Sequence, residues 1–255
     1  MAYKTYHSQT NYKDVEDFKR LDFIVNEIAK INNPNAKILD IGCGNGNISL
    51  ALGSLGYNVK GIDIDETSVK TASSRNKFSN VSFEVYDANQ FEMGDIFDAI
   101  VCSEVLEHLI TPEQLVKSIL KILKPGGIFV ATVPNGLGPR EVLITKPMQW
   151  LTKNKFDGPI NFIKKLLGYN ATTHQSSNPD LTHIQFFTVG SFKKLIGGNG
   201  FKLISFKNAD FIERIFPYSF LTRRLRFLQT LDCFIADFLP KQLTCGFYTS
   251  WTKPK

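Results

Sequence analysis

Cysteine is scarce in this sequence. The four cysteines form no CxxC pair and show no zinc-finger spacing; they are Cys43, Cys102, Cys233 and Cys245. This spacing predicts neither a disulfide framework nor a structural zinc site, so we expect a reducing, cytoplasmic environment. For Cys43 and Cys102 we expect the role of a small buried apolar side chain.

Long apolar runs are also missing. No stretch reaches the uninterrupted apolar length of a membrane span, and the N-terminal sequence MAYKTYHSQTNYKD lacks the apolar core of a secretory signal, so we expect neither. The sequence contains no internal repeat and no low-complexity tract. Its 255 residues, 43% of them hydrophobic, suit one sizeable core, and we expect a single domain over residues 1–255.

Charge is unevenly distributed along the chain, although the formal net charge is only +6. Residues 1–135 hold 13 Lys and Arg against 17 Asp and Glu, whereas residues 136–255 hold 17 against 7. The two parts therefore carry net charges of −4 and +10. Two interpretations stay open: a solvated basic surface, or a C-terminal half that meets an anionic partner such as a phosphorylated substrate, a nucleic acid or a membrane surface.

Short apolar runs alternate with segments of helical spacing along most of the chain. The expected strands are Lys37–Ile41, Asn58–Ile62, Val81–Val85, Phe97–Cys102, Ile128–Val133, Phe201–Phe206 and Gly246–Trp251. Helices are expected over residues 14–30, from Ile48, from Glu66, from Thr111 and over residues 189–197. This alternation predicts an α/β fold with a parallel sheet that binds ligands at the carboxyl ends of its strands.

The most informative stretch is ILDIGCGNGN, residues 38–47. Its glycines at 42, 44 and 46 allow a tight turn and a close approach of a ligand to the backbone. A dinucleotide fingerprint would place a third glycine at position 47, where this chain has Asn47. Asp40, two residues before the first glycine, would repel a pyrophosphate but suits a ligand that carries an amino group.

Two further acids follow the next two expected strands. Asp63 ends the second strand, where a carboxylate can accept hydrogen bonds from a ribose diol. Asp87 ends the third, where it can accept from the exocyclic amine of adenine. A single such aspartate would be an ordinary loop or capping residue, but three acids at the ends of successive strands indicate a ligand with an amine, a ribose and an adenine.

These motifs resemble those of the class I S-adenosylmethionine-dependent methyltransferases over about residues 36–135, and more weakly through Phe186–Phe201. ILDIGCGNG resembles the family's cofactor loop, GIDID its ribose acid, YDA its adenine contact, FDAIVCSEVLEHL its fourth motif and LKPGG the turn before the fifth strand. The resemblance implies a Rossmann-like seven-stranded, mostly parallel sheet with helices on both faces and an antiparallel last strand. It also implies an enzyme of the EC 2.1.1 class.

The resemblance also implies how the chain is divided and which residues bind the cofactor. We expect an N-terminal helical lid (1–35), a cofactor-binding core (36–135), an inserted helical segment on the acceptor side (134–187) and a C-terminal part of the sheet (188–255). The residues expected at S-adenosylmethionine are Asp40, Gly42, Cys43, Gly44, Asn47, Asp63, Ile64, Asp87, Ala88 and Ser103.

The segment SEVLEH after the fourth strand carries the candidate reaction chemistry. Glu104, Glu107 and His108 share one face of a helical turn, and such a donor set can hold a divalent cation. The segment resembles the metal-binding E-x-x-E-H of ubiquinone-biosynthesis O-methyltransferases and of small-RNA-terminal 2′-O-methyltransferases, with His183 in place of the later histidine of the RNA enzymes. Two alternatives stay open: a structural role for these residues, or His108 or His183 as a metal-free general base.

Several functions compete at this point. The favoured one is transfer of a methyl group to a hydroxyl of a small molecule, such as a sugar, lipid-linked saccharide, phenol or natural product, in a pocket formed by residues 134–187. The alternative is a metal-dependent RNA 2′-O-methyltransferase, which the basic half favours and the scattering of its basic residues among leucines and phenylalanines disfavours. A non-catalytic binding protein and a nicotinamide oxidoreductase fit the motifs poorly. O-, N- or C-methylation and the oligomeric state stay open.

The C-terminal segment 211–243 is predicted to be helical, amphipathic and basic. A helix over residues 221–239 would place one apolar face along Leu221, Leu225, Leu228, Leu231, Ile235 and Phe238, with Arg223, Arg224 and Arg226 off that face. Arg214 lies earlier in the same segment. Such a helix can lie on an anionic bilayer, which would make the protein peripheral to the membrane. We favour a helix packed on the enzyme as a wall over an acidic or phosphorylated acceptor, because an apolar stripe usually faces the core.

Overall fold

A computed structural model describes residues 4–88, 94–154, 183–213, 215, 218–222 and 224–255. Within them, seven strands form one sheet in the order β3-β2-β1-β4-β5-β7-β6. The strands are β1 (Lys37–Ile41), β2 (Asn58–Asp63), β3 (Val81–Val85), β4 (Phe97–Ser103), β5 (Leu123–Pro134), β6 (Lys202–Asn208) and β7 (Gly246–Thr252). β1 to β5 pair in parallel, and β7 is antiparallel to both β5 and β6. The predicted fold class is confirmed.

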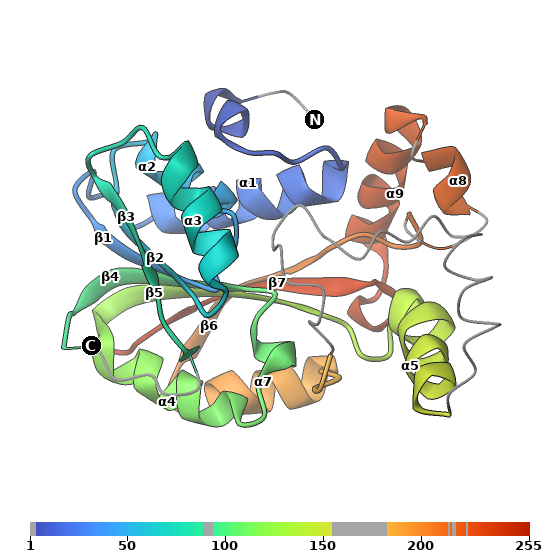
Figure 1. Cartoon of the computed structure of the whole chain (residues 1–255). Coiled ribbons are helices and arrows are strands. Elements are labelled where there is room, and N and C mark those ends of the chain that lie inside the picture. The colour runs from blue at the N-terminus through green and yellow to red at the C-terminus, as the bar shows by residue number, and fades with distance from the viewer. Residues whose placement is uncertain (1–3, 89–93, 155–182, 214, 216–217, 223) are drawn as a thin grey trace.

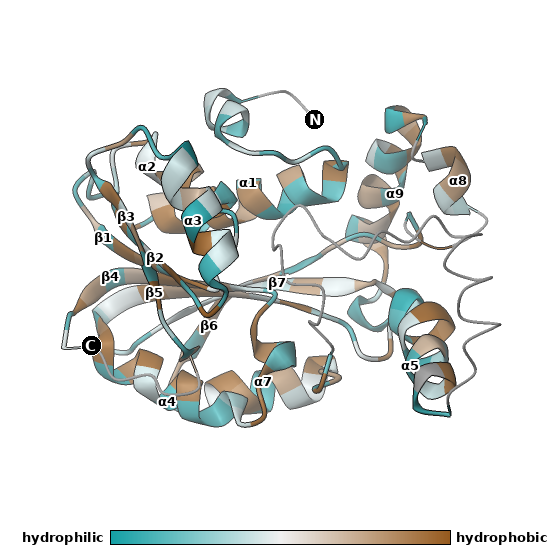
Figure 2. Ribbon diagram, in the orientation of Figure 1, coloured by the Kyte–Doolittle hydropathy of each residue, from teal (hydrophilic) through white to brown (hydrophobic). Residues whose placement is uncertain are grey.

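Helices cover both faces of the sheet (Figure 1). They are α1 (Val15–Ala29), α2 (Asn47–Gly53), α3 (Glu66–Arg75), α4 (Pro112–Ile122), α5 (Lys146–Lys153), α7 (Val189–Gly197), α8 (Tyr218–Thr222) and α9 (Arg226–Phe238). α1 and α2 join one apolar cluster with one face of the sheet, and α4 and α7 join another on the opposite face. The central strands are buried on both sides, which explains their continuous apolar runs, visible in Figure 2.

The expected strands lie where the sequence placed them, with one informative difference. β1 and β3 have the expected bounds, and the other strands differ from them by up to two residues, apart from β5. β5 begins at Leu123, not at Ile128, because LKPGG already pairs with β4 through Leu123 and Phe97, with an irregularity before Ala99. The segment expected to separate helix from strand is therefore the beginning of the strand itself.

The N-terminal segment packs against the sheet. Leu21, Ile24 and Ile28 of α1 are fully buried, so this helix is part of the core. Before α1, the single turn η1 (Thr5–Gln9) is held by Tyr6, whose hydroxyl donates to Asp22 Oδ1 at 2.6 Å. The opening and closing of residues 1–35 as a lid stays a prediction.

The C-terminal helical segment differs most from expectation. A continuous helix over residues 221–239 is wrong: the chain forms α8, a break around Leu225, and then α9. Arg214 and Arg223 lie outside the described residues, as does most of the predicted inserted segment, of which residues 134–154 form the π-helical turn η4 (Glu141–Thr145) and α5. No helix in the described part of the chain is long and apolar enough to cross a bilayer.

Candidate active site

The glycine-rich loop after β1 rests on the end of β2. The backbone N–H groups of Gly42 and Cys43 donate to the carbonyl oxygen of Ile62 at 2.8 and 2.9 Å. The next N–H along the chain, that of Gly44, donates to Asp63 Oδ2 at 2.8 Å. These bonds bring the predicted amine-binding loop and the predicted ribose acid to one place at the carboxyl ends of the parallel strands.

The first glycine of the loop is required by its surroundings. Gly42 has a φ of +71°, and a Cβ atom there would lie 2.2 Å from Val105 Cγ2. Such a distance is an outright clash, so any larger residue would displace the loop or the turn after β4. The contact also shows that the loop lies directly against the segment that carries Glu104 and Glu107.

Asp40 is the buried acid of this loop. Its side chain is 1% exposed, and Oδ2 accepts a hydrogen bond from Ser49 Oγ at 2.6 Å. Oδ1 is buried and has no hydrogen-bond partner among the described residues. Desolvation raises the pKa of Asp40 to about 7. The nearby charge of Asp63 also raises this pKa, whereas the Ser49 hydrogen bond lowers it. The orphaned oxygen suits a ligand that brings a cationic amino group, as the sequence predicts.

Asp63 and Asp87 lie side by side at the ends of β2 and β3. Asp63 Oδ1 accepts from the N–H of Asp65 at 2.9 Å, and burial raises the pKa of Asp63 above its ordinary value. The N–H of Tyr86 donates to the Asp63 carbonyl oxygen at 2.9 Å, which fixes the half-buried Asp87 next to it. The two acids thus lie at the carboxyl ends of neighbouring strands, and their binding of ribose and adenine stays a prediction.

The remaining predicted cofactor residues fall into two groups. Ile64, after β2, is 57% exposed, and Ala88, after β3, is half-buried. Cys43 is buried, and burial raises the pKa of its thiol. Its backbone N–H donates to Ile62 and its carbonyl oxygen accepts from the N–H of Gly46, so cofactor binding by Cys43 stays a prediction. Asn47 holds the N-terminal segment in place, because its Oδ1 accepts from the N–H of Asn11 at 3.0 Å and from Arg75 Nη1 at 3.0 Å.

A chain of hydroxyl groups ends β4. Ser103 Oγ lies 2.9 Å from Thr132 Oγ1, and Thr132 Oγ1 donates to Glu104 Oε1 at 3.0 Å. Ser103 therefore donates to Thr132, and only its lone pairs remain for a cofactor. Glu104 itself has a φ of +57°, a left-handed conformation that is strained for a residue with a side chain. Strain at the carboxyl end of a central strand is typical of a functional turn.

Three of the four predicted metal ligands converge. Carboxylate and imidazole atoms of Glu107, His108 and His183 all lie within 4.8 Å of one another. His108 Nε2 is 3.7 Å from Glu107 Oε1, and the two imidazole rings are 5.1 Å apart between centroids. Glu104 is not in this group, and its Oε1 accepts a hydrogen bond from Thr132 Oγ1. Its part in a four-residue ligand set stays a prediction.

The donor set fits a divalent cation. Glu107 is fully buried, and neither carboxylate oxygen has a hydrogen-bond partner among the described residues. Burial, together with the charge of Glu104, raises the pKa of Glu107 well above its ordinary value. A cation between one carboxylate and two imidazoles would supply the missing partner for Glu107.

Two residues of this site escaped the sequence analysis. Glu141, at the first position of η4, is fully buried, with Oε2 3.4 Å from His183 Nδ1, so it can orient that imidazole. Arg20 of α1 is 4% exposed and interacts electrostatically with Glu104 and Glu107. Neither stands in a motif, and only their charge at otherwise apolar helical positions could have drawn attention to them.

The family comparison agrees with this geometry. The model of a family described as a methyltransferase domain matches residues 14–206. Among curated relatives, the ubiquinone biosynthesis O-methyltransferase of Pseudomonas fluorescens is 32% identical over 139 residues, which are 52% of this chain and 59% of the relative. The human mitochondrial ubiquinone biosynthesis O-methyltransferase is 38% identical over 105 residues, which are 38% of this chain and 28% of the relative. The chain spans about half the length of the curated relatives that it matches, and less of the human protein.

Solved structures share the fold. An S-adenosylmethionine-dependent methyltransferase from Mesorhizobium loti superimposes with a TM-score of 0.61 at 17% identity, over 94% of this chain and 98% of that one. The N-methyltransferase NodS of Bradyrhizobium japonicum, in complex with S-adenosylhomocysteine, gives a TM-score of 0.59 at 14% identity, over 95% and 90% of the two chains. The family match and the shared fold lead to one conclusion: the chain belongs to the family described as a methyltransferase domain.

Proposed function

We propose that the chain transfers the methyl group of S-adenosylmethionine to a hydroxyl oxygen of a small molecule. The observation that carries the proposal is the group formed by Glu107, His108 and His183, held against the cofactor loop through the contact of Val105 with Gly42. Methyl transfer itself needs mainly proximity and orientation, because the cofactor supplies the electrophile. For a hydroxyl acceptor, the protein must also remove the hydroxyl proton or weaken the O–H bond.

The group can do this in either of two ways. A divalent cation held by Glu107, His108 and His183 would act as a Lewis acid on the acceptor oxygen. Without a cation, His183 can accept the proton, since Glu141 lies within 3.4 Å of its other ring nitrogen and would stabilise the imidazolium that forms. Both routes keep Glu107 and His183 next to the reacting oxygen, and the O-methyltransferase names of the curated relatives support a hydroxyl acceptor.

The metal route is favoured over the metal-free one by the burial of Glu107. A buried carboxylate without donors is costly unless it is protonated or bound to a cation. The favoured acceptors are phenols and catechols, whose hydroxyl groups lose a proton to a metal or a base near neutral pH most readily. The RNA alternative gains no support from the relatives, whose names describe ubiquinone biosynthesis.

The test measures formation of S-adenosylhomocysteine from S-adenosylmethionine with a panel of soluble phenols and catechols. We expect methylation on oxygen, loss of at least tenfold in rate with EDTA, and recovery with Mg²⁺ or Zn²⁺. Glu107→Gln should lower kcat at least a hundredfold and leave the affinity for S-adenosylhomocysteine within about threefold. Glu141→Gln, which changes only the partner of His183, should cost roughly ten- to a hundredfold.

Glu113→Gln is the matched control, because Glu113 is an exposed glutamate on α4 with a side chain 59% exposed. It should retain the rate of the unaltered enzyme. Full activity in excess EDTA combined with loss in His183→Ala would reject the metal and leave His183 as the base. Full activity in both Glu107→Gln and His183→Ala would reject the proposed site, whereas methylation of nitrogen or carbon only would reject the acceptor class.

A further inference from the structure

Helix α9 has its apolar side turned outward. Phe227, Leu231, Phe234 and Phe238 recur at the spacing of one helical face, and their side chains are 64%, 46%, 59% and 75% exposed. The opposite face, which is buried, carries Gln229, Asp232, Cys233 and Ala236. The sequence-based preference for a packed leucine face is therefore wrong: the predicted face exists, but it points away from the protein.

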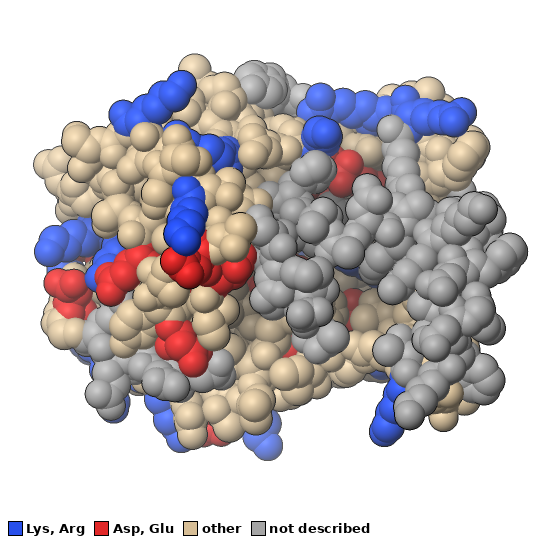
Figure 3. All heavy atoms as spheres, viewed as in Figure 1, with Lys and Arg blue, Asp and Glu red and all other residues tan. Residues whose placement is uncertain are grey.

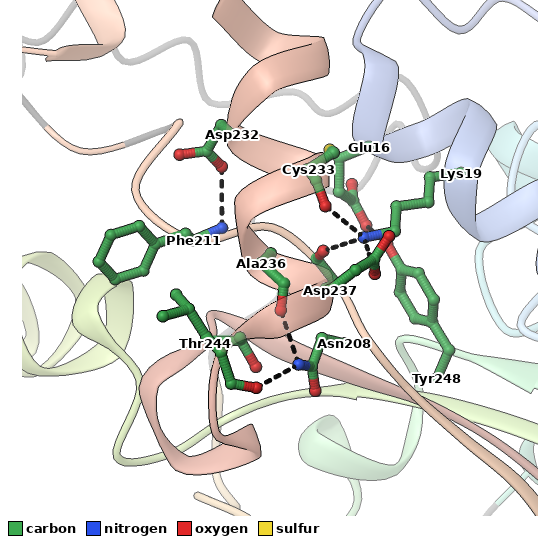
Figure 4. Close-up of polar contacts among 12 residues, drawn as sticks. Glu16, Lys19, Asn208, Phe211, Asp232, Cys233, Ala236, Asp237, Thr244 and Tyr248 are labelled. Atoms are coloured by element: carbon green, nitrogen blue, oxygen red, sulfur yellow. Dashed lines mark hydrogen bonds and ion pairs between the residues drawn. The ribbon is translucent and has the colours of Figure 1, made fainter. Parts of the chain in front are cut away.

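Polar contacts on the buried side fix this orientation. The carboxylate of Asp232 accepts from the N–H groups of Phe211 and Ile212 at 2.8 and 3.0 Å (Figure 4). Gln229 is bound at both ends, since Oε1 accepts from the N–H of Val15 at 3.1 Å and Nε2 donates to Thr222 O at 3.1 Å. These bonds satisfy backbone groups of neighbouring segments, and a rotation of the helix about its axis would break them all.

Two anchors from outside the helix strengthen the attachment. Lys19 of α1 donates to the carbonyl oxygens of Ala209 and Cys233 at 2.7 and 3.0 Å and pairs with Asp237 Oδ1 at 2.7 Å (Figure 4). Asn208 donates through Nδ2 to Ala236 O at 2.7 Å. The outward direction of the apolar face is thus built into the fold, and Asp237, the exposed acid of α9, is already paired.

The apolar face continues onto α8, and arginines border it. Phe220 of α8 is 57% exposed, and we name the surface formed by Phe220, Phe227, Leu231, Phe234, Ile235 and Phe238 the α8–α9 apolar face. Arg224 lies 4.7 Å above the ring of Phe220, and Arg226, the exposed first residue of α9, lies 5.5 Å above the ring of Phe18 of α1. Figure 3 shows a band of Lys and Arg atoms across the part of the surface where Figure 1 places α9.

We infer that the α8–α9 apolar face docks the protein onto an anionic lipid surface. Exposed phenylalanines on one side of a helix with arginines at its border are the features of helices that lie in the membrane interface. The long arginine side chains can reach lipid phosphates while the phenylalanine rings enter the apolar layer. An exposed apolar surface of this extent is unusual unless something covers it. Charge complementarity selects anionic lipid as the occupant, because residues 136–255 carry a net charge of +10.

The inference concerns a surface separate from the group around Glu107, and it holds whichever acceptor the enzyme uses. The test is co-sedimentation of the full chain with vesicles of phosphatidylcholine alone or with added phosphatidylglycerol. We expect binding to the anionic vesicles only, and weaker binding as salt concentration rises. Exchange of both Arg224 and Arg226 for Gln should lower the partition coefficient roughly 25-fold, since each cation near such a surface contributes about fivefold.

The apolar part is tested by Phe234→Asp with Phe238→Asp, which should abolish vesicle binding. Ile110→Asp is the matched control, because Ile110 is also 75% exposed but precedes α4, on the other face of the sheet. Unchanged affinity for S-adenosylhomocysteine in every variant shows that the fold is intact. Absence of binding by the unaltered chain, or equal binding by the Phe234/Phe238 variant, overturns the inference. A dimer in size-exclusion chromatography that Phe234→Asp dissociates would also overturn it, by identifying the face as a contact between copies.

Discussion

At the scale of single residues, Asp40 is a buried carboxylate whose Oδ1 has no hydrogen-bond donor among the described residues. Its pKa of about 7 lies above the ordinary value of 3.8, so the folded chain holds this proton from about pH 4 to about pH 7 and the unfolded chain does not. The free energy of unfolding of the unliganded protein therefore falls as pH rises through this window, because the Asp40 carboxyl ionises more readily in the unfolded chain than in the folded one. A cationic ligand beside Asp40 would favour the ionised carboxylate over the protonated one.

The first prediction follows from this reversal. S-adenosylhomocysteine, whose amino group we place at Asp40, should bind best above about pH 7 and lose affinity, by up to tenfold per pH unit, as pH falls below it. Isothermal titration calorimetry between pH 5.5 and 8 measures this dependence. Asp40→Asn removes the titrating group, so its affinity should be lower at pH 8 and nearly constant with pH. A slope that survives in Asp40→Asn would show that another group is responsible.

The second prediction concerns Gly42. Gly42→Ala introduces a Cβ atom 2.2 Å from Val105 Cγ2 at a residue with positive φ, so it should destabilise the fold by about 1–3 kcal/mol and weaken cofactor binding. Gly190→Ala is the control, since its Cβ would meet only Thr188 Oγ1, at 3.9 Å, in the first turn of α7. Urea unfolding should show no loss for Gly190→Ala. Equal free energies of unfolding for both variants would contradict the account of the loop.

At the scale of elements, the sequence predicts what depends on local pattern. The bounds of β1 and β3 follow directly from apolar runs ended by turn residues, and the start of α2 follows from the glycine loop. The ligand group was predictable in part, because Glu107 and His108 stand in a motif and His183 was the later histidine that could join them. Glu141 was not, since its place beside His183 depends on the path of the chain after β5.

The orientation of α9 shows where pattern stops being sufficient. Periodicity says which residues share a face, but it does not say which face turns inward. Here Gln229 and Asp232 find backbone donors and acceptors in segments more than five residues away along the chain, and those bonds decide the rotation. Non-local polar contacts of this kind leave no periodic signal in the sequence, so the apolar stripe was assigned to the wrong side.

A third prediction tests this explanation. Asp232→Ala leaves the N–H groups of Phe211 and Ile212 without their acceptor, which should cost about 2 kcal/mol or more of unfolding free energy. Asp237→Ala removes a carboxylate that is 47% exposed and should cost less than about 1 kcal/mol. Chemical denaturation of the two variants gives the comparison. If Asp237→Ala is the more damaging, the buried polar side does not hold α9.

At the scale of the whole molecule, the fold places two separate surfaces on one sheet. The carboxyl ends of β1 to β4 gather the acids Asp40, Asp63 and Asp87 with the Glu107 group, while α8 and α9 present apolar side chains outward on the C-terminal side of the chain. An enzyme arranged in this way can take a soluble cofactor at one edge while resting on a lipid surface through another. The family match over residues 14–206 includes the first surface, whereas α8 and α9 lie beyond it.

The central claim is that the loop at residues 42–47 and Asp63 form a site for S-adenosylmethionine. The most direct measurement is calorimetric titration of the full chain with S-adenosylhomocysteine. We predict one ligand per chain, with affinity reduced roughly ten- to 150-fold in Asp63→Ala, because a charge-assisted contact to the ribose is lost, and unchanged in Glu66→Gln, whose side chain is 68% exposed. Gly44→Val should bind no ligand, since a branched residue cannot adopt its φ of +51° without strain. Undiminished affinity in both Asp63→Ala and Gly44→Val, or tighter binding of NADH than of S-adenosylhomocysteine, would contradict the assignment.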